Sequence, residues 1–241
     1  IEVELFKPKQ LALISKAIML DNIGPAIEAM GSVLSGIDIE DLTVGDFYFL
    51  MTWQRLNCFT RNPLTASWQC NGAMFNDIQT NKHYKPEDVK ALVESWNNAD
   101  EEARKSLVDP DTVELDAFVC GHHNMANVTF SDFTVQHLAD AVVLDSRLDY
   151  PRCGTLAEFV ELQSDPDVGM LADAAQWIRG GTLRERINNL MEEDTTELFE
   201  LACEANRDVR HGILRTLYKP CASCGHKHEI NFVVEPRSFF L

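Results

Sequence analysis

The chain has 241 residues, enough to bury a sizeable core in one large domain or in two smaller ones. Its hydrophobic content of 45% and charged content of 24% are typical of a soluble globular protein, and its apolar runs are too short to span a bilayer. The formal net charge of −17 argues against binding to nucleic acid or to anionic membranes, since both require clustered Lys and Arg. The stretch Ile1–Leu5 lacks the basic flank and apolar run of a signal peptide, so we expect synthesis in the cytosol.

The first quarter of the chain predicts a short strand followed by helices. From alternation and apolar stripes we expect a strand over 1–6 and helices from about Pro8, from about Gly24 and over 47–56. Thr43 with Asp46 three residues later resembles a helix N-cap. The helix that it opens is apolar nearly all round except at Arg55, which needs a carboxylate or carbonyl partner if it is buried.

The middle of the chain mixes strands and helices. We expect a β-like segment over 64–75, a helix over 86–97, strands over 113–120 and 127–134, and a helix with Val135, Leu138 and Val142. The two later strands are predicted to pair as a hairpin with Cys120–His123 at its tip.

The last third predicts helices and a terminal hairpin. Capping patterns stand at Thr155–Glu158, Thr182–Glu185 and Asp194–Glu197, and strands are expected over Ile213–Tyr218 and Glu229–Val234. The fold class is therefore α+β, mostly helical with short antiparallel β-hairpins and a zinc-ribbon-like hairpin at the C-terminal end. The regions are expected over 1–75, 76–150 and 151–241, or as one compact domain overall.

The segment Pro220–His228 carries the clearest chemical signal. Cys221 and Cys224 are two residues apart and are followed by Gly225, a spacing typical of a loop that grips a tetrahedral metal. A redox pair would place the first thiol at a helix N-terminus, where its pKa falls, but a hairpin is predicted instead. The pattern therefore favours a structural zinc ion.

Two further ligands must come from elsewhere, because zinc takes four thiolate or imidazole donors. One candidate pair is Cys70 and Cys120, each followed closely by a glycine. A second set is local, and consists of His211, His226 and His228. A third possibility is two sites, the first of which uses Cys58, Cys70, Cys120 and His122. The chain has seven cysteines, more than one site needs, and we expect Cys153 and Cys203 to act as small hydrophobic side chains that bind no metal.

We find no sequence motif for catalysis. The phosphate-binding, dinucleotide-binding, metalloprotease and serine-hydrolase patterns are all absent from the sequence. Cys120 with His122 and His123 is faintly similar to a zinc-deaminase motif, but the glutamate that such a motif needs after its histidine is missing. We therefore expect no catalytic residues and no organic cofactor.

Several short segments occur in an order that is typical of one protein family. They are Phe6-Lys7-Pro8, Asp41–Leu50 running into Arg55, Trp68-Gln69-Cys70, His211-Gly212 before the Cys-x-x-Cys-Gly loop, and Ser238-Phe239-Phe240. Together they resemble the baseplate hub and hub-assembly proteins of T-even-type contractile-tailed bacteriophages, over about 1–75 and 195–241. Where that family has a paired first cysteine knuckle, this chain has Cys70-Asn71-Gly72 with no second thiol two residues later, so Cys120 enters as the substitute.

The resemblance implies a structural or assembly protein of the phage tail baseplate, without catalytic activity. Such a protein is made in the host cytoplasm, resides in the virion, and belongs to a large homo- or hetero-oligomeric assembly. The terminal residues Phe239, Phe240 and Leu241 are expected to contact other tail proteins. Two alternatives are a small zinc-dependent hydrolase or deaminase, and a metal-free acidic tail-assembly chaperone.

Overall fold

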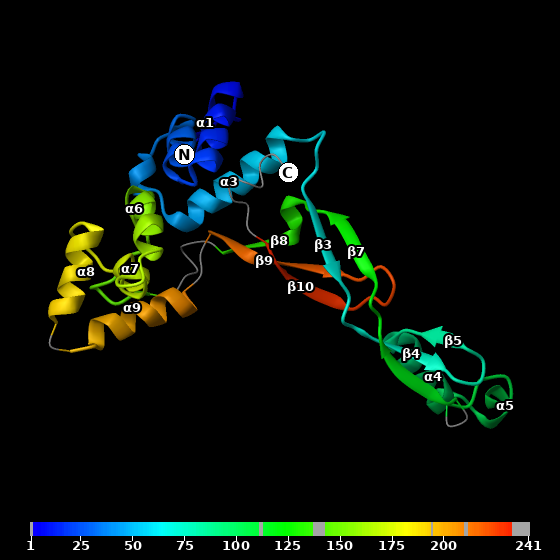
Figure 1. The fold of residues 1–241 in the computed structure, drawn as a ribbon. Helices are drawn as coiled ribbons and strands as arrows, with labels where there is room; N and C mark the ends of the chain where they lie inside the picture. The colour runs from blue at the N-terminus through cyan, green and yellow to red at the C-terminus, as the bar shows by residue number, and fades with distance from the viewer. Residues whose placement is uncertain (1, 111–112, 137–142, 194, 210–211, 233–241) are drawn as a thin grey trace. The chain divides into compact units, whose positions relative to one another are not determined.

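The computed structural model describes residues 2–110, 113–136, 143–193, 195–209 and 212–232 (Figure 1). The chain forms two compact units. Unit 1 comprises Ile1–Leu64, Thr129–Arg215 and Phe232–Leu241, and unit 2 comprises Thr65–Val128 and Thr216–Asn231. The three expected regions do not follow these bounds, because each unit is built from segments that are far apart in the sequence.

The α+β class is confirmed, since helices and short antiparallel sheets together make up the fold. Within the described ranges, none of the helices is long and apolar enough to cross a membrane.

Unit 1 is mainly helical. Its elements are β1 (Glu2–Val3), α1 (Pro8–Leu20), α2 (Gly24–Gly31), β2 (Leu34–Ser35), η1 (Ile39–Asp41), α3 (Val44–Cys58), η3 (Phe130–Asp132), β8 (Phe133–Gln136), α6 (Cys153–Gln163), α7 (Gly169–Ala175), α8 (Leu183–Glu192) and α9 (Glu197–Asp208). The expected strand over 1–6 is only two residues long and pairs with β2. The predicted helix starts near Pro8 and Gly24 are confirmed.

The third helix is a buried element of unit 1, as its apolar sequence predicts. The backbone N–H of Asp46 donates to Thr43 Oγ1 at 3.2 Å, which confirms the cap. Phe47 and Met51 are fully buried, and so is Arg55. Arg55 has the expected carbonyl partner, since its Nη1 donates to the backbone oxygen of Asn62 at 3.0 Å.

In unit 1, the helix expected around Val135 and the expected cap at Thr155 both differ from the structure. Val135 belongs to β8 rather than to a helix, and Leu138 and Val142 lie outside the described residues. The Thr155 cap is wrong, because α6 begins at Cys153 and its N-cap position is Arg152. The Thr182 cap is confirmed. Of the expected pattern Asp194–Glu197, Asp194 lies outside the described residues, and Thr196 precedes α9 without a side-chain cap.

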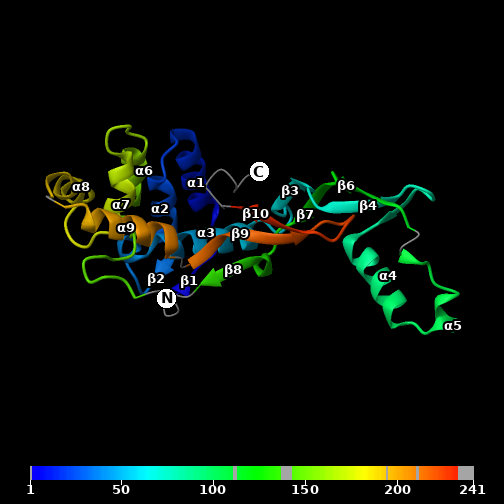
Figure 2. The same ribbon diagram turned by 90° about the horizontal axis from the view of Figure 1, so that it is seen from below.

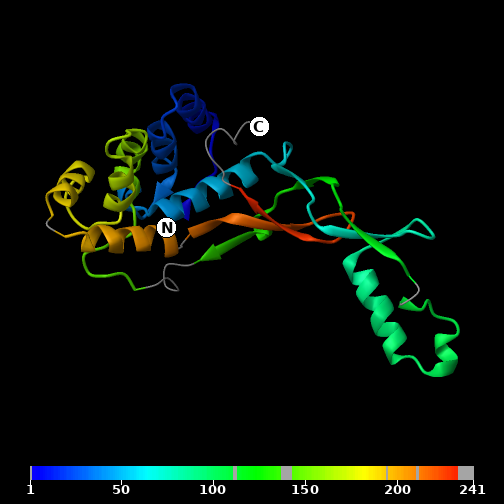
Figure 3. The same ribbon diagram turned by 60° about the horizontal axis from the view of Figure 1, so that its bottom comes forward.

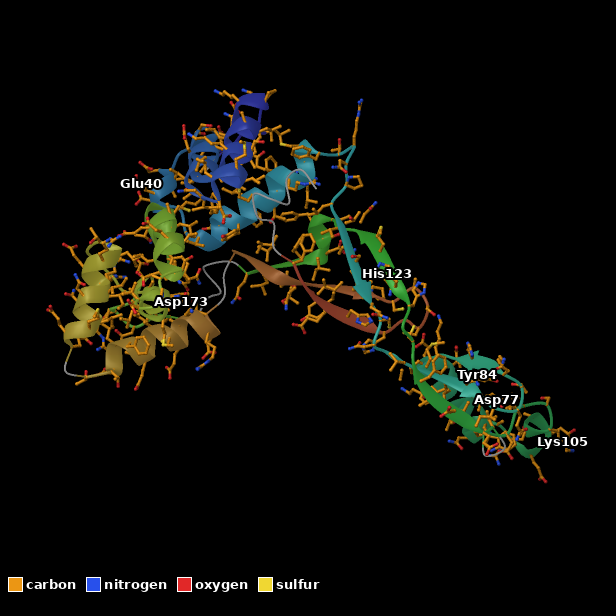
Figure 4. All side chains as sticks on the ribbon, in the orientation of Figure 1. Glu40, Asp77, Tyr84, Lys105, His123 and Asp173 are labelled. Atoms are coloured by element: carbon orange, nitrogen blue, oxygen red, sulfur yellow. The ribbon has the colours of Figure 1, made fainter. Side chains whose placement is uncertain are left out.

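Unit 2 is a β-ribbon with a small helical lobe. Its elements are β3 (Thr65–Gln69), β4 (Ala73–Asp77), β5 (Lys82–Tyr84), α4 (Pro86–Asn98), α5 (Glu101–Arg104), β6 (Leu115–Val119), β7 (His123–Asn127), β9 (Gly212–Pro220) and β10 (Lys227–Asn231), of which β9 begins in unit 1. Figures 2 and 3 show α4 and α5 as a lobe next to β4, and Figure 4 labels Lys105 just after α5, Asp77 on β4 and Tyr84 on β5.

The strand pairing of unit 2 differs from the predicted hairpin. The expected single segment 64–75 is two strands, β3 and β4, and the expected 113–120 strand is β6. β6 pairs with β4 and β7 pairs with β3, so β6 and β7 do not pair with each other. Cys120 and His122 therefore lie in a break between two consecutive strands rather than at a hairpin tip.

One register runs through both halves of this ribbon. Thr65 is opposite Asn127 and Gln69 is opposite His123 in the first half. Continuing the same count brings Ala73 opposite Val119 in the second half, which is the observed pair. The chain therefore behaves as one antiparallel ladder that is interrupted only at 70–72 and 120–122, and that interruption holds two cysteines.

Candidate metal centre

The interruption in the ribbon and the C-terminal hairpin bring four cysteines together in unit 2. The Sγ atoms of Cys70, Cys120, Cys221 and Cys224 all lie within 4.8 Å of one another. Three of these side chains are buried and Cys120 is partly buried. Among the described residues, no other group of three or more His, Cys, Asp or Glu side chains is close enough to hold a metal.

The sulfur positions suit a single tetrahedral ion. The Sγ atoms of Cys70 and Cys224 are 3.4 Å apart, and those of Cys120 and Cys221 are 3.9 Å apart. A tetrahedron with metal–sulfur bonds of about 2.3 Å has edges of roughly 3.8 Å. All seven cysteines are free thiols, so none of the four is in a disulfide. Four cysteines in this arrangement could hold a metal ion.

The C-terminal half of the centre is a tight loop between β9 and β10. The backbone N–H of Cys221 donates to the oxygen of His226, and the N–H of Gly225 donates back to the oxygen of Cys221, both at 2.9 Å. Gly225 has a φ of +77°, a left-handed conformation that glycine adopts without steric cost. β9 and β10 pair over Thr216–Pro220 and Lys227–Asn231, so the predicted hairpin is confirmed, while residues 233 and 234 of its expected second strand lie outside the described residues.

The other half comes from the two strand breaks. The N–H of Cys70 donates to the oxygen of His122 at 2.9 Å, and the N–H of Cys120 donates to the oxygen of Gly72 at 2.8 Å. These bonds fix the two loops side by side even though 50 positions separate their cysteines in the numbering. The strand pairing therefore holds Cys70 close to Cys120, as the short β9–β10 loop holds Cys221 close to Cys224.

Several N–H groups point at the thiols. The backbone N–H of Gly72 lies 3.3 Å from Cys70 Sγ, and the N–H of Ser223 lies 3.4 Å from Cys221 Sγ. Each of these two sulfurs also has a side-chain neighbour, since His228 Nε2 is 3.1 Å from Cys70 Sγ and Asn124 Nδ2 is 3.4 Å from Cys221 Sγ. The backbone N–H groups and the Asn124 amide among these neighbours stabilise sulfur in its charged, metal-binding form.

The pKa values of the buried thiols reflect this environment. Burial raises the pKa of Cys70 and of Cys224, because a thiolate loses its hydration there. Burial also opposes ionisation of Cys221, but the N–H groups of Cys224, Asn124 and Ser223 outweigh it and lower the pKa of that thiol. A bound cation would offset the remaining cost of ionising the set.

The other ligands considered from the sequence are placed differently. Cys58 lies in unit 1, where its Sγ is 3.3 Å from Gln54 Oε1. His122 is exposed and offers its backbone oxygen to the ribbon, and His226 is also exposed. His228 is buried beside the cluster and contacts Cys70 through Nε2, while His211 lies outside the described residues.

The two remaining cysteines pack among other residues of unit 1. Cys153 is buried at the start of α6, and Cys203 packs partly buried against the apolar cluster of α7 and α9. Both belong to unit 1.

The sequence alone did not single out Asn124, which lies on β7 beside His123, a residue labelled in Figure 4. It is 4% exposed, and its side chain contacts both ligand loops. The sequence carried no signal for it, because Asn124 falls between the strands expected over 113–120 and 127–134 and was not expected to be buried.

Comparison of this chain with models of known protein families, with curated proteins and with solved structures returned no significant match.

Proposed function

We propose that Cys70, Cys120, Cys221 and Cys224 bind one structural Zn²⁺ ion. The observation that carries this proposal is the closed set of four thiols within 4.8 Å. Four thiolates fill the tetrahedron that zinc prefers, which is the arrangement of structural rather than catalytic sites. When bound, the ion would hold the ribbon of 65–128 to the hairpin of 216–231 within unit 2.

We further propose that the protein is a structural or assembly component of a contractile phage tail baseplate hub and acts through protein–protein contacts. The support is the resemblance carried by Asp41–Leu50 with Arg55, by Trp68–Cys70 and by the Cys-x-x-Cys-Gly loop. A structural metal and a sequence without catalytic motifs agree with such a role. Co-purification of the tagged chain with tail proteins from infected cells tests it, and a chain that associates with none of them would contradict it.

The two alternatives make different demands on the same four thiols. A hydrolase or deaminase needs an open metal position for water and a base, and four thiolate ligands leave no such position. A metal-free acidic chaperone would use the net charge of −17 to cover a basic partner surface and would need no ion at the cluster.

The zinc proposal predicts a loss of both metal and stability in Cys221→Ser. Mass spectrometry of the freshly purified, reduced protein should find one zinc per chain, and the variant should lose most of it. Its unfolding temperature should fall sharply, because the binding energy of a structural metal is folding energy. Cys203→Ser is the matched control, since Cys203 lies in unit 1, and it should keep its zinc.

Wild-type protein without zinc would reject the metal site and favour the chaperone. A Cys221→Ser protein that lost an enzymatic turnover but kept its stability would favour the hydrolase.

A further inference from the structure

The side chain of Asn124 uses its amide to connect the two halves of the four-cysteine cluster. Its Oδ1 accepts from the backbone N–H of Ala222 at 3.0 Å. Its Nδ2 donates to the backbone oxygen of His122 at 3.0 Å and lies 3.4 Å from Cys221 Sγ. One side chain therefore binds the loop that carries Cys120 and also the loop that carries Cys221.

The chemistry of these contacts fixes the orientation of the amide. An amide nitrogen has two hydrogens and no acceptor capacity, so one hydrogen can point to the His122 oxygen and the other to the Cys221 sulfur. The reversed amide would place its oxygen against two acceptors and its nitrogen against the Ala222 N–H, which is a donor. Because Asn124 is 4% exposed, water cannot readily replace these partners.

We propose that Asn124 is a positioning residue of the metal centre. It holds the Cys120 loop and the Cys221 loop at the separation that the metal requires, and it stabilises the charge on the Cys221 thiolate through an N–H···S hydrogen bond. This inference rests on the proposed metal site, but it concerns a residue that supplies no ligand atom. Partners of this kind typically change metal affinity by about 10- to 100-fold.

The test replaces the donor without changing the shape of the side chain. Asn124→Asp keeps an oxygen for the Ala222 N–H but turns a second oxygen toward Cys221 Sγ and the His122 oxygen, where it repels both. Competition with a chromophoric chelator should show Zn²⁺ and Co²⁺ affinities about 10- to 100-fold lower than in the wild type. The sulfur-to-cobalt charge-transfer band of the Co²⁺ protein should also shift, because the Cys221–metal bond is altered.

Asn127→Asp is the matched control. Asn127 is an exposed asparagine on the same strand, so this variant adds the same charge away from the cluster and should match the wild type in affinity and spectrum. Asn124→Ala serves if the aspartate variant does not fold. It removes the same hydrogen bonds without a buried charge, so a smaller loss of affinity and a shifted band are expected.

The outcomes separate this inference from the zinc proposal. Wild-type protein that fails to bind Zn²⁺ or Co²⁺ through its thiols would overturn both. Wild-type binding together with unchanged affinity and an unchanged band in Asn124→Asp, or in Asn124→Ala if the first variant is unfolded, would overturn the positioning role alone.

Discussion

Gly72 follows Cys70 by two residues and lies against the C-terminal knuckle. A Cβ atom at this position would be 2.5 Å from His226 Cβ and 3.1 Å from Cys224 Sγ. His226 Cβ is joined directly to the backbone, so it cannot move aside as the end of a long side chain could. The approach of the two ligand loops therefore depends on the absence of a side chain at position 72.

Gly72→Ala should accordingly weaken the metal centre. The added methyl group forces the Cys70 loop away from Cys224, and overpacking of this kind costs about 1–3 kcal/mol. Thermal unfolding should show the lost stability, and metal titration should show weaker binding. Asn71→Ala, an exposed change in the same loop, should leave both unchanged. A Gly72→Ala protein with wild-type metal affinity would show that the two ligand loops can make room for a methyl group, and would contradict this prediction.

The sequence predicted some residues of the metal centre and missed others. The Cys221–Cys224 knuckle was predictable because its geometry arises within nine consecutive residues that include Gly225. Cys70 and Cys120 could be named only as one of three ligand sets, since their approach depends on strand pairing across the inserted residues 78–114. Gly72 could be noted only as the glycine that follows Cys70, and Asn124 supplies no ligand atom, so no ligand pattern could reveal its part in the site.

Two helices of unit 1 show how neighbouring chain segments decide where a helix begins. Both α6 and α8 contain the pattern Thr-Leu-x-Glu, at Thr155 and at Thr182. In α8 the backbone N–H of Glu185 donates to Thr182 Oγ1 at 3.2 Å, and Glu185 Oε2 accepts from the Thr182 N–H at 2.8 Å. In α6 the helix starts earlier, because Cys153 donates its backbone N–H to the oxygen of Leu42 and so ties the helix start to another segment.

The same substitution should therefore have different effects at the two positions. Thr182→Ala removes an N-cap and should destabilise unit 1 by about 1 kcal/mol, as measured by chemical denaturation. Thr155→Ala removes only a hydrogen bond from Oγ1 to the oxygen of Arg152 within the first turn of the helix, and should cost less. Equal losses would show that the capping box of α8 contributes nothing of its own.

The Thr182 cap should also depend on pH. The backbone and hydroxyl groups of Thr182 lower the pKa of Glu185 in the folded protein. The carboxylate therefore stabilises the fold fully above its unfolded pKa of about 4.3, and this contribution disappears as the pH falls through the lower folded value. The difference in stability between wild type and Glu185→Gln should shrink on acidification through this range, because the protonated carboxyl is then as neutral as the amide.

The whole molecule is acidic, and its chain passes from unit 1 to unit 2 and back twice. Both segments of unit 2 supply metal ligands, with Cys70 and Cys120 from 65–128 and Cys221 and Cys224 from 216–231. Bringing together segments so far apart in sequence costs chain entropy on folding, and the binding energy of a structural metal offsets that cost. Strand pairing over such distances also explains why the unit bounds were not evident from the sequence.

The residues proposed to contact other tail proteins are Phe239, Phe240 and Leu241, which lie outside the described residues. Deletion of these three residues should reduce co-purification with tail proteins from infected cells, because a buried aromatic anchor contributes about 2 kcal/mol or more to an interface. The truncated monomer should unfold at the wild-type temperature, and Ser238→Ala should co-purify normally. An insoluble or molten truncation would place these residues in the core of the fold instead.

The unbroken register of the ribbon has a consequence for recognising such proteins. Lys82–Tyr84 pair with β4, and the backbone N–H of Ile78 donates to the oxygen of Glu114, so it is the helical segment 85–110 that lies outside the strand pairing. The length of that segment can change without moving Cys70 relative to Cys120, so insertions and deletions in the α4–α5 lobe should be tolerated among relatives. A search pattern with fixed spacing between those two cysteines would miss such relatives, whereas one that allows a variable gap and fixes only the Cys-x-x-Cys-Gly loop would find them.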